Sequence, residues 1–180
     1  PELEAATLVQ GGRERGLILH KLMEEVLTGE VLETEAALIE RAAELIRALG
    51  HSPVADPATG LSAEELAACV ARTLALPDIV ALRPGLLAEF PVYAAQAADG
   101  VEAVTAGIAD ALTLTAEGRP AVVVDWKSDV TPAPEALDHY RAQVRAYLSM
   151  TGAERGLIVL MSSGTVIPVL PTQPTASKAA

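Results

Sequence analysis

Two aspartates and one lysine have the residue types and spacing that predict chemistry in this sequence. Asp110 lies in the segment GIADALT, and Asp125 and Lys127 lie in VVVDWKSD. Both segments have the composition of β-strands, and the residues between them predict a turn centred on Glu117 and Gly118. A hairpin with this turn places Asp110 directly opposite Asp125, where partner Cβ atoms are about 5 Å apart and like charges repel. Lys127 shares the face of Asp125, because side chains alternate along a strand.

A divalent cation would relieve the repulsion between these two carboxylates. Carboxylate oxygens are hard ligands that suit Mg²⁺, and Lys127 could position or help deprotonate an attacking water and stabilise charge on a phosphate. The pattern therefore predicts metal-assisted phosphodiester hydrolysis. The alternative is a structural ion pair between Asp110 and Lys127, with Asp125 pointing at solvent, because a D-x-K triplet by itself is short and common.

The residues around the charged groups favour the metal site over the ion pair. Alternation places Val123 on the face of Asp125 and five other apolar residues on the face of Asp110. These five are Val104, Ala106, Ile108, Leu112 and Leu114. Buried charge is costly unless it is paired or bound to metal, so the pattern predicts carboxylates on the core side of a sheet that converge on a cation.

Helices and strands alternate in blocks along the chain, which predicts an α/β domain. Apolar spacing and helix-end signals predict helices over residues 13–28, 34–49, 62–74 and 135–150, with Gly50 after the second helix and a capping box of Ser62 with Glu65 at the third. Strands are predicted over 86–96, 101–115 and 120–129 as an antiparallel meander with a first turn at 98–100. A further hairpin is predicted over 155–170.

Composition and charge limit the possible functions. The chain has 180 residues, of which 51% are hydrophobic, and no apolar run approaches the length of a membrane span, so we expect one soluble, cytoplasmic domain over 1–171 and a disordered tail over 172–180. Its one cysteine, Cys69, excludes an intrachain disulfide or a cysteine-ligated iron–sulfur cluster. A net charge of -11 argues against an autonomous nucleic-acid binder. The absence of a Gly-rich phosphate loop argues against ATP hydrolysis.

The chain resembles the PD-(D/E)XK phosphodiesterases, and among them the RecB-like nuclease domain of bacterial helicase–nucleases such as RecB and AddA. Five segments carry the resemblance in the same order: RGLILHKLMEE, AEFPV, GIADALT, VVVDWKSD and YRAQVRAY. The resemblance covers most of the chain. It implies a restriction-endonuclease-like fold, an α/β architecture with a central mixed β-sheet flanked by helices.

The resemblance also implies roles for individual residues. His20, Asp110 and Asp125 match the metal ligands, and the backbone carbonyl of Trp126 would complete the protein's share of the metal shell. Glu24 and Glu89 match acidic positions that orient ligands or water, and we count Glu89 with Asp110, Asp125 and Lys127 as catalytic. The alternative for His20 is an ordinary core or surface histidine, and for the two glutamates it is a solvated charge.

One face of the last predicted helix carries Tyr140, Gln143 and Tyr147 at i, i+3 and i+7. The resemblance implies that this face contacts DNA. The alternative is half-buried packing against the sheet, which explains Tyr147 as well as DNA contact does but explains Gln143 less well.

The function implied by the resemblance is degradation of DNA by a magnesium-dependent nuclease, with Mn²⁺ as a substitute metal and no iron–sulfur cluster. Cleavage would be exonucleolytic on single strands and would serve double-strand-break repair, with helicase domains of the same longer chain and a second subunit as partners. Two alternatives stay open: a non-catalytic interaction module on a nuclease fold, and a metal-dependent hydrolase of another phosphate ester.

Overall fold

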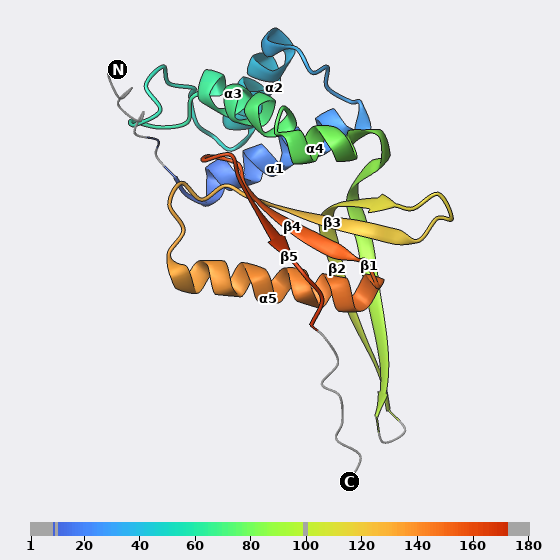
Figure 1. Cartoon of the computed structure of the whole chain (residues 1–180). Helices are drawn as coiled ribbons and strands as arrows, with labels where there is room; N and C mark the ends of the chain where they lie inside the picture. Colours follow the sequence, from blue (N-terminus) through green and yellow to red (C-terminus); the bar gives the residue numbers. More distant parts are fainter. Residues whose placement is uncertain (1–8, 10, 99–100, 173–180) are drawn as a thin grey trace, which may run out of the picture.

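The computed structural model describes residues 9, 11–98 and 101–172, and it arranges them in three layers. Helices α1 to α4 lie on one side of a five-stranded sheet, and helix α5 lies on the other side (Figure 1). The elements follow the order α1 (Arg13–Thr28), α2 (Glu35–Ala48), α3 (Ala63–Leu74), α4 (Pro77–Leu82), η1 (Arg83–Gly85), β1 (Leu86–Ala98), β2 (Val101–Leu114), β3 (Pro120–Lys127), α5 (Pro134–Thr151), β4 (Arg155–Leu160) and β5 (Thr165–Val169). Residues 99–100 of the predicted first turn and 173–180 of the predicted tail lie outside the described residues.

The sheet is mixed, as expected. Its strands lie in the order β1-β2-β3-β4-β5, and all neighbours are antiparallel except β3 and β4, which are parallel. The antiparallel meander and the closing hairpin predicted from the sequence are both present, and α5 makes the connection that two parallel neighbours require. The α/β fold with a mixed sheet flanked by helices is therefore confirmed.

Local signals mark the start of α2 and the ends of α1 and α2. Thr34 caps α2 by accepting a hydrogen bond from the amide of Ala37 at 3.3 Å. Gly29 and Gly50 follow α1 and α2 with φ of 83° and 85°, a conformation that glycine adopts without steric cost. Helix α4 was not predicted, because six residues are too few to show a helical period.

The predicted capping box of α3 forms only in part. The Ser62 hydroxyl accepts a hydrogen bond from the amide of Glu65 at 3.4 Å. The Glu65 carboxylate, which would complete the box, instead binds Arg15 of α1 at 2.7 Å. A tertiary ion pair thus replaces the local half of the motif.

Two apolar clusters hold the layers together, one on each face of the sheet. Strand β3 contributes alternately to both: Val124 and Trp126 pack under α1 to α4, whereas Val123 packs against α5 beside Val144. Gly156 of β4 lets α5 approach closely, because a Cβ at this position would overlap Val144. Among the helices that the structure describes, none is both long enough and apolar enough to cross a membrane.

Candidate active site

A row of three carboxylate residues crosses the three antiparallel strands. The register pairs Ala88 of β1 with Ala111 of β2, and Ala111 in turn with Val124 of β3. The next position in each strand carries an acidic residue: Glu89 in β1, Asp110 in β2 and Asp125 in β3. The pairing of Ala111 with Val124 is the register that the predicted turn implied for Asp110 and Asp125.

Strands β1 and β2 change faces at this row. Leu86 packs on the side of α1 to α4, whereas Val92, an even number of residues later, packs on the side of α5. A regular strand would keep both side chains on one face. Glu89 lies between them with a φ of 50°, a left-handed conformation that costs roughly 1–2 kcal/mol for a non-glycine residue. Strain of this kind persists only where the surrounding structure imposes it, and it gathers at functional sites.

The change of face corrects the apolar surface predicted around Asp110. Leu112 is buried, but Ile108 is 55% exposed and Leu114 is 38% exposed. Ala106 is exposed too, and the Val104 side chain lies outside the described residues. The prediction assumed unbroken alternation along β2. Instead, the strand changes faces at Asp110, and its pairing with β3 shifts register between Thr113 and Leu114.

Asp125 is the most deeply buried acidic residue of the row, with an exposed fraction of 2%. The ammonium of Lys127 donates a hydrogen bond to its Oδ1 at 3.2 Å and lies 2.9 Å from its Oδ2, although the latter contact lacks hydrogen-bond geometry. Oδ2 is therefore buried with ion-pair attraction but no hydrogen bond. Burial raises the pKa of Asp125 to about 6. The positive charge of Lys127 acts to lower this pKa, and the negative charge of Asp110 acts to raise it.

Helix α5 holds the ammonium of Lys127 beside Asp125. The carbonyl oxygen of the Gln143 side chain accepts a hydrogen bond from Lys127 at 3.0 Å, and the Tyr140 ring centroid lies 4.6 Å from the Lys127 nitrogen. The Gln143 amide in turn donates to the Tyr147 hydroxyl at 3.3 Å. The three residues predicted to contact DNA therefore converge on the site, and two of them directly contact Lys127.

Tyr147 also has the packing role that was its alternative. A Cβ added to Gly107 of β2 would lie 3.1 Å from the Tyr147 ring, so the ring rests on this glycine. Asp129, which the sequence did not single out, accepts a hydrogen bond from the Tyr140 hydroxyl at 2.8 Å. Burial and this hydrogen bond raise the pKa of Tyr140 to about 12. The sequence signal that could have included Asp129 in the site is its position two residues after Lys127.

Asp110 joins helix α1 to strand β3. Its Oδ2 accepts a hydrogen bond from the Trp126 amide at 2.8 Å, and its Oδ1 lies 3.5 Å from Nδ1 of His20. Burial alone would lower the pKa of His20, but the hydrogen bond and charge of Asp110 outweigh burial and raise it. The structure thus brings His20, Asp110 and Asp125 to one place. It shows the Trp126 amide engaged there, whereas a ligand role for the Trp126 carbonyl remains a prediction.

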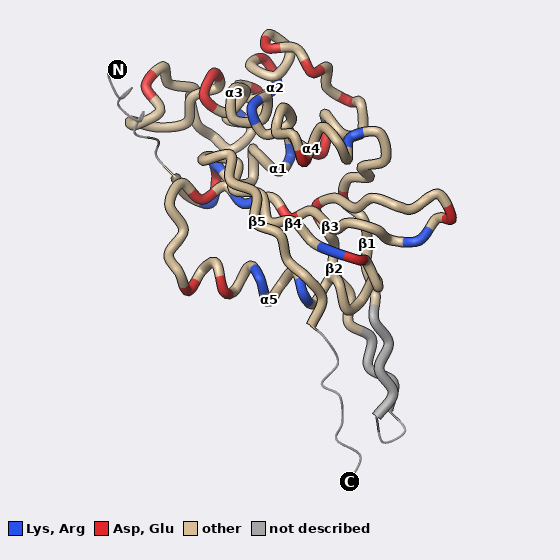
Figure 2. Tube along the Cα trace, in the orientation of Figure 1, with Lys and Arg blue, Asp and Glu red and all other residues tan. Residues whose placement is uncertain are grey.

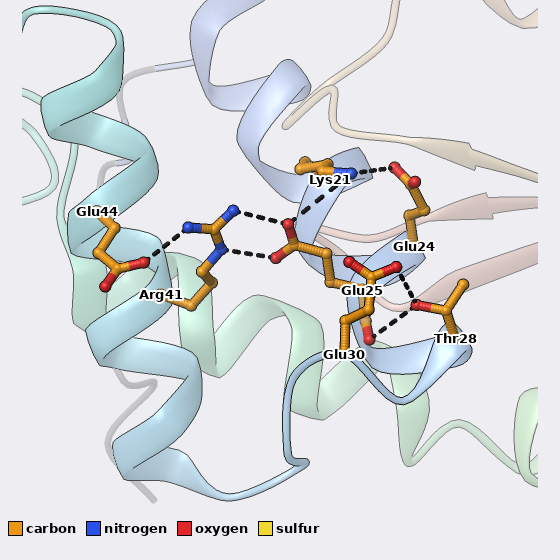
Figure 3. A network of polar contacts seen from close by, with 7 residues as sticks. All are labelled: Lys21, Glu24, Glu25, Thr28, Glu30, Arg41 and Glu44. Atoms are coloured by element: carbon orange, nitrogen blue, oxygen red, sulfur yellow. Dashed lines mark hydrogen bonds and ion pairs between the residues drawn. The ribbon is translucent and has the colours of Figure 1, made fainter.

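Glu24 and Glu89 add negative charge at the edge of this site. Burial raises the pKa of Glu89, and the charges of Asp110 and Glu24 raise it further. Glu24 accepts a hydrogen bond from Lys21 at 3.0 Å (Figure 3).

The neighbouring Glu25 belongs to a different contact, which ties α1 to α2. Arg41 of α2 donates two hydrogen bonds of 2.7 Å to the Glu25 carboxylate, which is 3% exposed (Figure 3). This pairing lowers the pKa of Glu25. It fixes the end of α1 without contacting the row of carboxylates.

The donor set fits a hard divalent cation. Two carboxylates and an imidazole converge, and the buried Oδ2 of Asp125 has no hydrogen bond to lose. Within the described residues, however, no three His, Cys, Asp or Glu side chains are already grouped as a metal site. Lys127 compensates the charge of Asp125 in this arrangement, so a cation would compete with Lys127 for Asp125.

Basic and acidic residues are interspersed in the part of the chain that the structure describes. Along the described chain, Lys and Arg are scattered among Asp and Glu on the helices and strands (Figure 2). This agrees with the net charge of -11. A net negative charge disfavours attraction of a polyanion by the chain as a whole.

Comparison with known proteins adds the decisive observation. The model of a family described as the PD-(D/E)XK nuclease superfamily matches residues 2–163. The chain belongs to this superfamily.

Membership of the PD-(D/E)XK superfamily indicates a metal-dependent nuclease, a hydrolase that acts on nucleic acid. No curated protein matches the chain. Among solved structures, the crystal structure of SSO0001 matches with a TM-score of 0.43 and 18% identity, over 92% of this chain and 82% of that chain.

Proposed function

We propose that this PD-(D/E)XK domain is a magnesium-dependent deoxyribonuclease that degrades single DNA strands exonucleolytically. The observation that carries the proposal is the placement of Asp110 beside Asp125 and Lys127, with a buried Asp125 oxygen that has no hydrogen bond. A buried carboxylate with a pKa raised to about 6 is a costly feature for a fold to keep without a use.

The residues divide the chemistry among them. The metal would be held by the side chains of His20, Asp110 and Asp125 and by the Trp126 carbonyl. A bound metal ion would act as a Lewis acid toward the phosphate and would lower the pKa of a bound water. Lys127 orients the attacking water and stabilises the charge that develops on the phosphate oxygens. The water oxygen loses one proton to solvent and bonds to phosphorus, the bond between phosphorus and the leaving sugar oxygen breaks, and that oxygen takes up one proton from solvent.

Helix α5 supports the reaction by limiting the freedom of Lys127. The hydrogen bond to Gln143 and the contact with the Tyr140 ring hold the ammonium beside Asp125. Preorganisation of this kind avoids an entropic cost during the reaction. We further propose that this face of α5 contacts the DNA strand once it has entered the site.

The proposed partner is a DNA helicase that delivers the strand, in the same longer chain or with a second subunit, for the repair of double-strand breaks. The resemblance to RecB and AddA domains supports it, as does the net charge of -11, which disfavours unaided DNA binding. Fluorescence anisotropy tests this part: we expect weak binding of single-stranded DNA by the isolated chain. Tight binding that weakens steeply with salt would contradict delivery by a partner.

The test of the catalytic proposal combines metal binding with cleavage. Isothermal titration of Mg²⁺ and Mn²⁺ is compared between the native chain and Asp110→Ala, and cleavage is followed for Asp125→Ala and Lys127→Ala. Asp138→Ala is the matched control, because its side chain is 78% exposed on α5 and pairs only with Arg141 among the described contacts. We expect loss of metal binding in Asp110→Ala, loss of cleavage in the other two site variants, and native behaviour in the control.

The choice of substrates separates the proposed activity from its alternatives. End-labelled linear DNA should be degraded and circular single-stranded DNA should resist, as an exonuclease requires. Hydrolysis of small phosphodiesters but not of DNA would favour a hydrolase of another ester. A native chain that neither binds metal nor cleaves would favour the interaction module, and cleavage that survives in Lys127→Ala would refute the mechanism.

A further inference from the structure

Arg15, at the start of α1, is a charged residue with an exposed fraction of 2%. Its guanidinium donates to both carboxylate oxygens of Glu65 in α3, at 2.7 and 3.2 Å. It also donates to the carbonyl oxygen of Ser128 at 2.8 Å and to the Ser162 hydroxyl at 3.0 Å. The hydrogen bonds and charge of Glu65 keep the pKa of Arg15 raised, although burial acts to lower it.

Stability alone is a weak reason for such a group. Well-packed apolar residues often replace a buried ion pair without loss of stability, whereas the pair itself must overcome the desolvation of both charges. An apolar residue cannot reproduce the planar guanidinium, whose N–H donors hold several acceptors in one geometry. The acceptors of Arg15 therefore indicate its function.

The acceptor that matters for the site is the carbonyl of Ser128. Ser128 directly follows Lys127, the last residue of β3. The Ser162 hydroxyl, beyond the end of β4, donates to the same carbonyl at 3.0 Å, and the Met161 amide donates to the Lys127 carbonyl at 2.9 Å. Arg15 thus anchors the end of the strand that carries Asp125 and Lys127.

The backbone of α1 approaches the same point. A Cβ added to Gly16 would lie 2.8 Å from the Ser128 hydroxyl oxygen and 3.7 Å from its Cβ, so the helix contacts Ser128 where it has no side chain. His20 follows Gly16 by about one helical turn, and a helix rises about 1.5 Å per residue. The contact at Ser128 therefore sets how far His20 lies from the end of β3.

We propose that Arg15 is a positioning residue that docks α1 on the end of β3 and so sets His20 against Asp110, Asp125 and Lys127. The proposal rests on the metal-dependent nuclease function proposed above. Arg15 does not touch the substrate or the metal. It acts through the Ser128 carbonyl, and Gly16 permits the close approach that the docking requires.

The test removes the docking contact while keeping the interior free of unpaired charge. Arg15→Met alone would leave Glu65 partly buried without its partner, so the variant to measure is Arg15→Met with Glu65→Gln. The matched control is Arg41→Met with Glu25→Gln, which removes the other ion pair that ties α1 to a neighbouring helix but does not contact β3. Both pairs join α1 to another helix through an arginine and a carboxylate, which is buried in Glu25 and partly buried in Glu65.

Four readouts distinguish positioning from general stability. Urea unfolding reports the stability of each variant, and fluorescence of Trp126, the only tryptophan in the chain, reports the fold of the site without metal. Titration with Mn²⁺ alone reports metal affinity. Cleavage of single-stranded DNA at saturating Mn²⁺ gives kcat and KM separately.

We expect the Arg15 variant to stay folded, to bind Mn²⁺ about 10- to 100-fold more weakly, and to lose about 100-fold in kcat with little change in KM. The Arg41 control should match the native chain in Mn²⁺ affinity and kcat. Arg15→Lys should restore only part of the loss, because one ammonium cannot bond Glu65 and the Ser128 carbonyl with the geometry of the fork.

Native Mn²⁺ affinity and kcat in the folded Arg15 variant would overturn the positioning role. Equal losses in the Arg15 and Arg41 variants would overturn it too, because they would trace to α1 stability in general. Failure of the native chain to bind Mn²⁺ would instead refute the proposed function, so the two failures are distinguishable.

Discussion

Replacing Asp125 by asparagine should stabilise the metal-free protein at neutral pH. Burial raises the pKa of this carboxyl from 3.8 to about 6, which means that the folded state holds its proton more tightly than the unfolded state does. The stabilisation from protonation is fully present below 3.8 and is lost as pH rises through about 6. A shift of this size corresponds to about 3 kcal/mol, at about 1.4 kcal/mol per pKa unit.

Asparagine has nearly the shape of aspartic acid and carries no charge, so the Asp125→Asn variant should escape this loss. In EDTA, the free energy of unfolding of the variant minus that of the native chain should grow by up to about 3 kcal/mol between pH 4 and pH 7.5. Urea unfolding at several pH values measures this difference, in which the titration of groups common to both proteins cancels. Asp138→Asn is the control, because that side chain is 78% exposed and should change little.

Addition of Mg²⁺ should make the native chain more stable than Asp125→Asn, the reverse of the order expected in EDTA. A ligand that binds only the folded state stabilises it by an amount set by its concentration relative to Kd, so Mg²⁺ should stabilise the native chain and leave Asp125→Asn unchanged. A difference between variant and native chain that is independent of pH in EDTA would refute the assignment of the buried charge. Equal stabilisation of both by Mg²⁺ would refute a metal role for Asp125.

Three further changes test the fold around the site by urea unfolding. Gly156→Ala should destabilise by about 1–3 kcal/mol, because the new methyl group overlaps Val144 where α5 meets the sheet, and unchanged stability would contradict that close approach. Glu89→Gly should leave stability unchanged or raise it by up to about 1 kcal/mol, because glycine adopts the left-handed conformation without strain and this offsets the greater flexibility of its unfolded state. Cleavage by this variant should fall, and a large loss of stability would contradict the strain at Glu89. Glu25→Gln should cost about 2 kcal/mol at pH 7, since Arg41 lowers the pKa of Glu25, and the difference from the native chain should shrink as pH falls through that pKa; a difference independent of pH would contradict the pairing.

Local sequence signals were sufficient to predict most of the helices and the strand pairing around the site. The predicted helix over 13–28 has the bounds of α1, because its end is set by Gly29 and its buried face by the spacing of Leu19, Leu22 and Met23. The position of the turn between β2 and β3 was enough to predict the pairing of Ala111 with Val124. From that register followed the approach of Asp110 to Asp125. The shift of register between Thr113 and Leu114, next to the turn, was not predicted.

Contacts between distant segments decided what these signals could not. The prediction of an unbroken apolar face along β2 was wrong because the pleat is interrupted at Glu89 and Asp110. The strained residue, Glu89, belongs to the neighbouring strand β1, so the segment GIADALT contains no signal of the interruption. The contacts of Arg15 could not be predicted either, since its partners Glu65 and Ser128 lie 50 and 113 residues away.

The sequence by itself determined which residues form helices and strands and which acidic groups meet across the hairpin, because capping, periodicity and turn geometry act over a few neighbouring residues. Only the tertiary structure decided that Gln143 of α5 holds Lys127 beside Asp125, that α1 packs against the end of β3, and that Ile108 is exposed. Burial and pKa depend on which surfaces the layers cover, and that is a property of packing between segments remote in the chain.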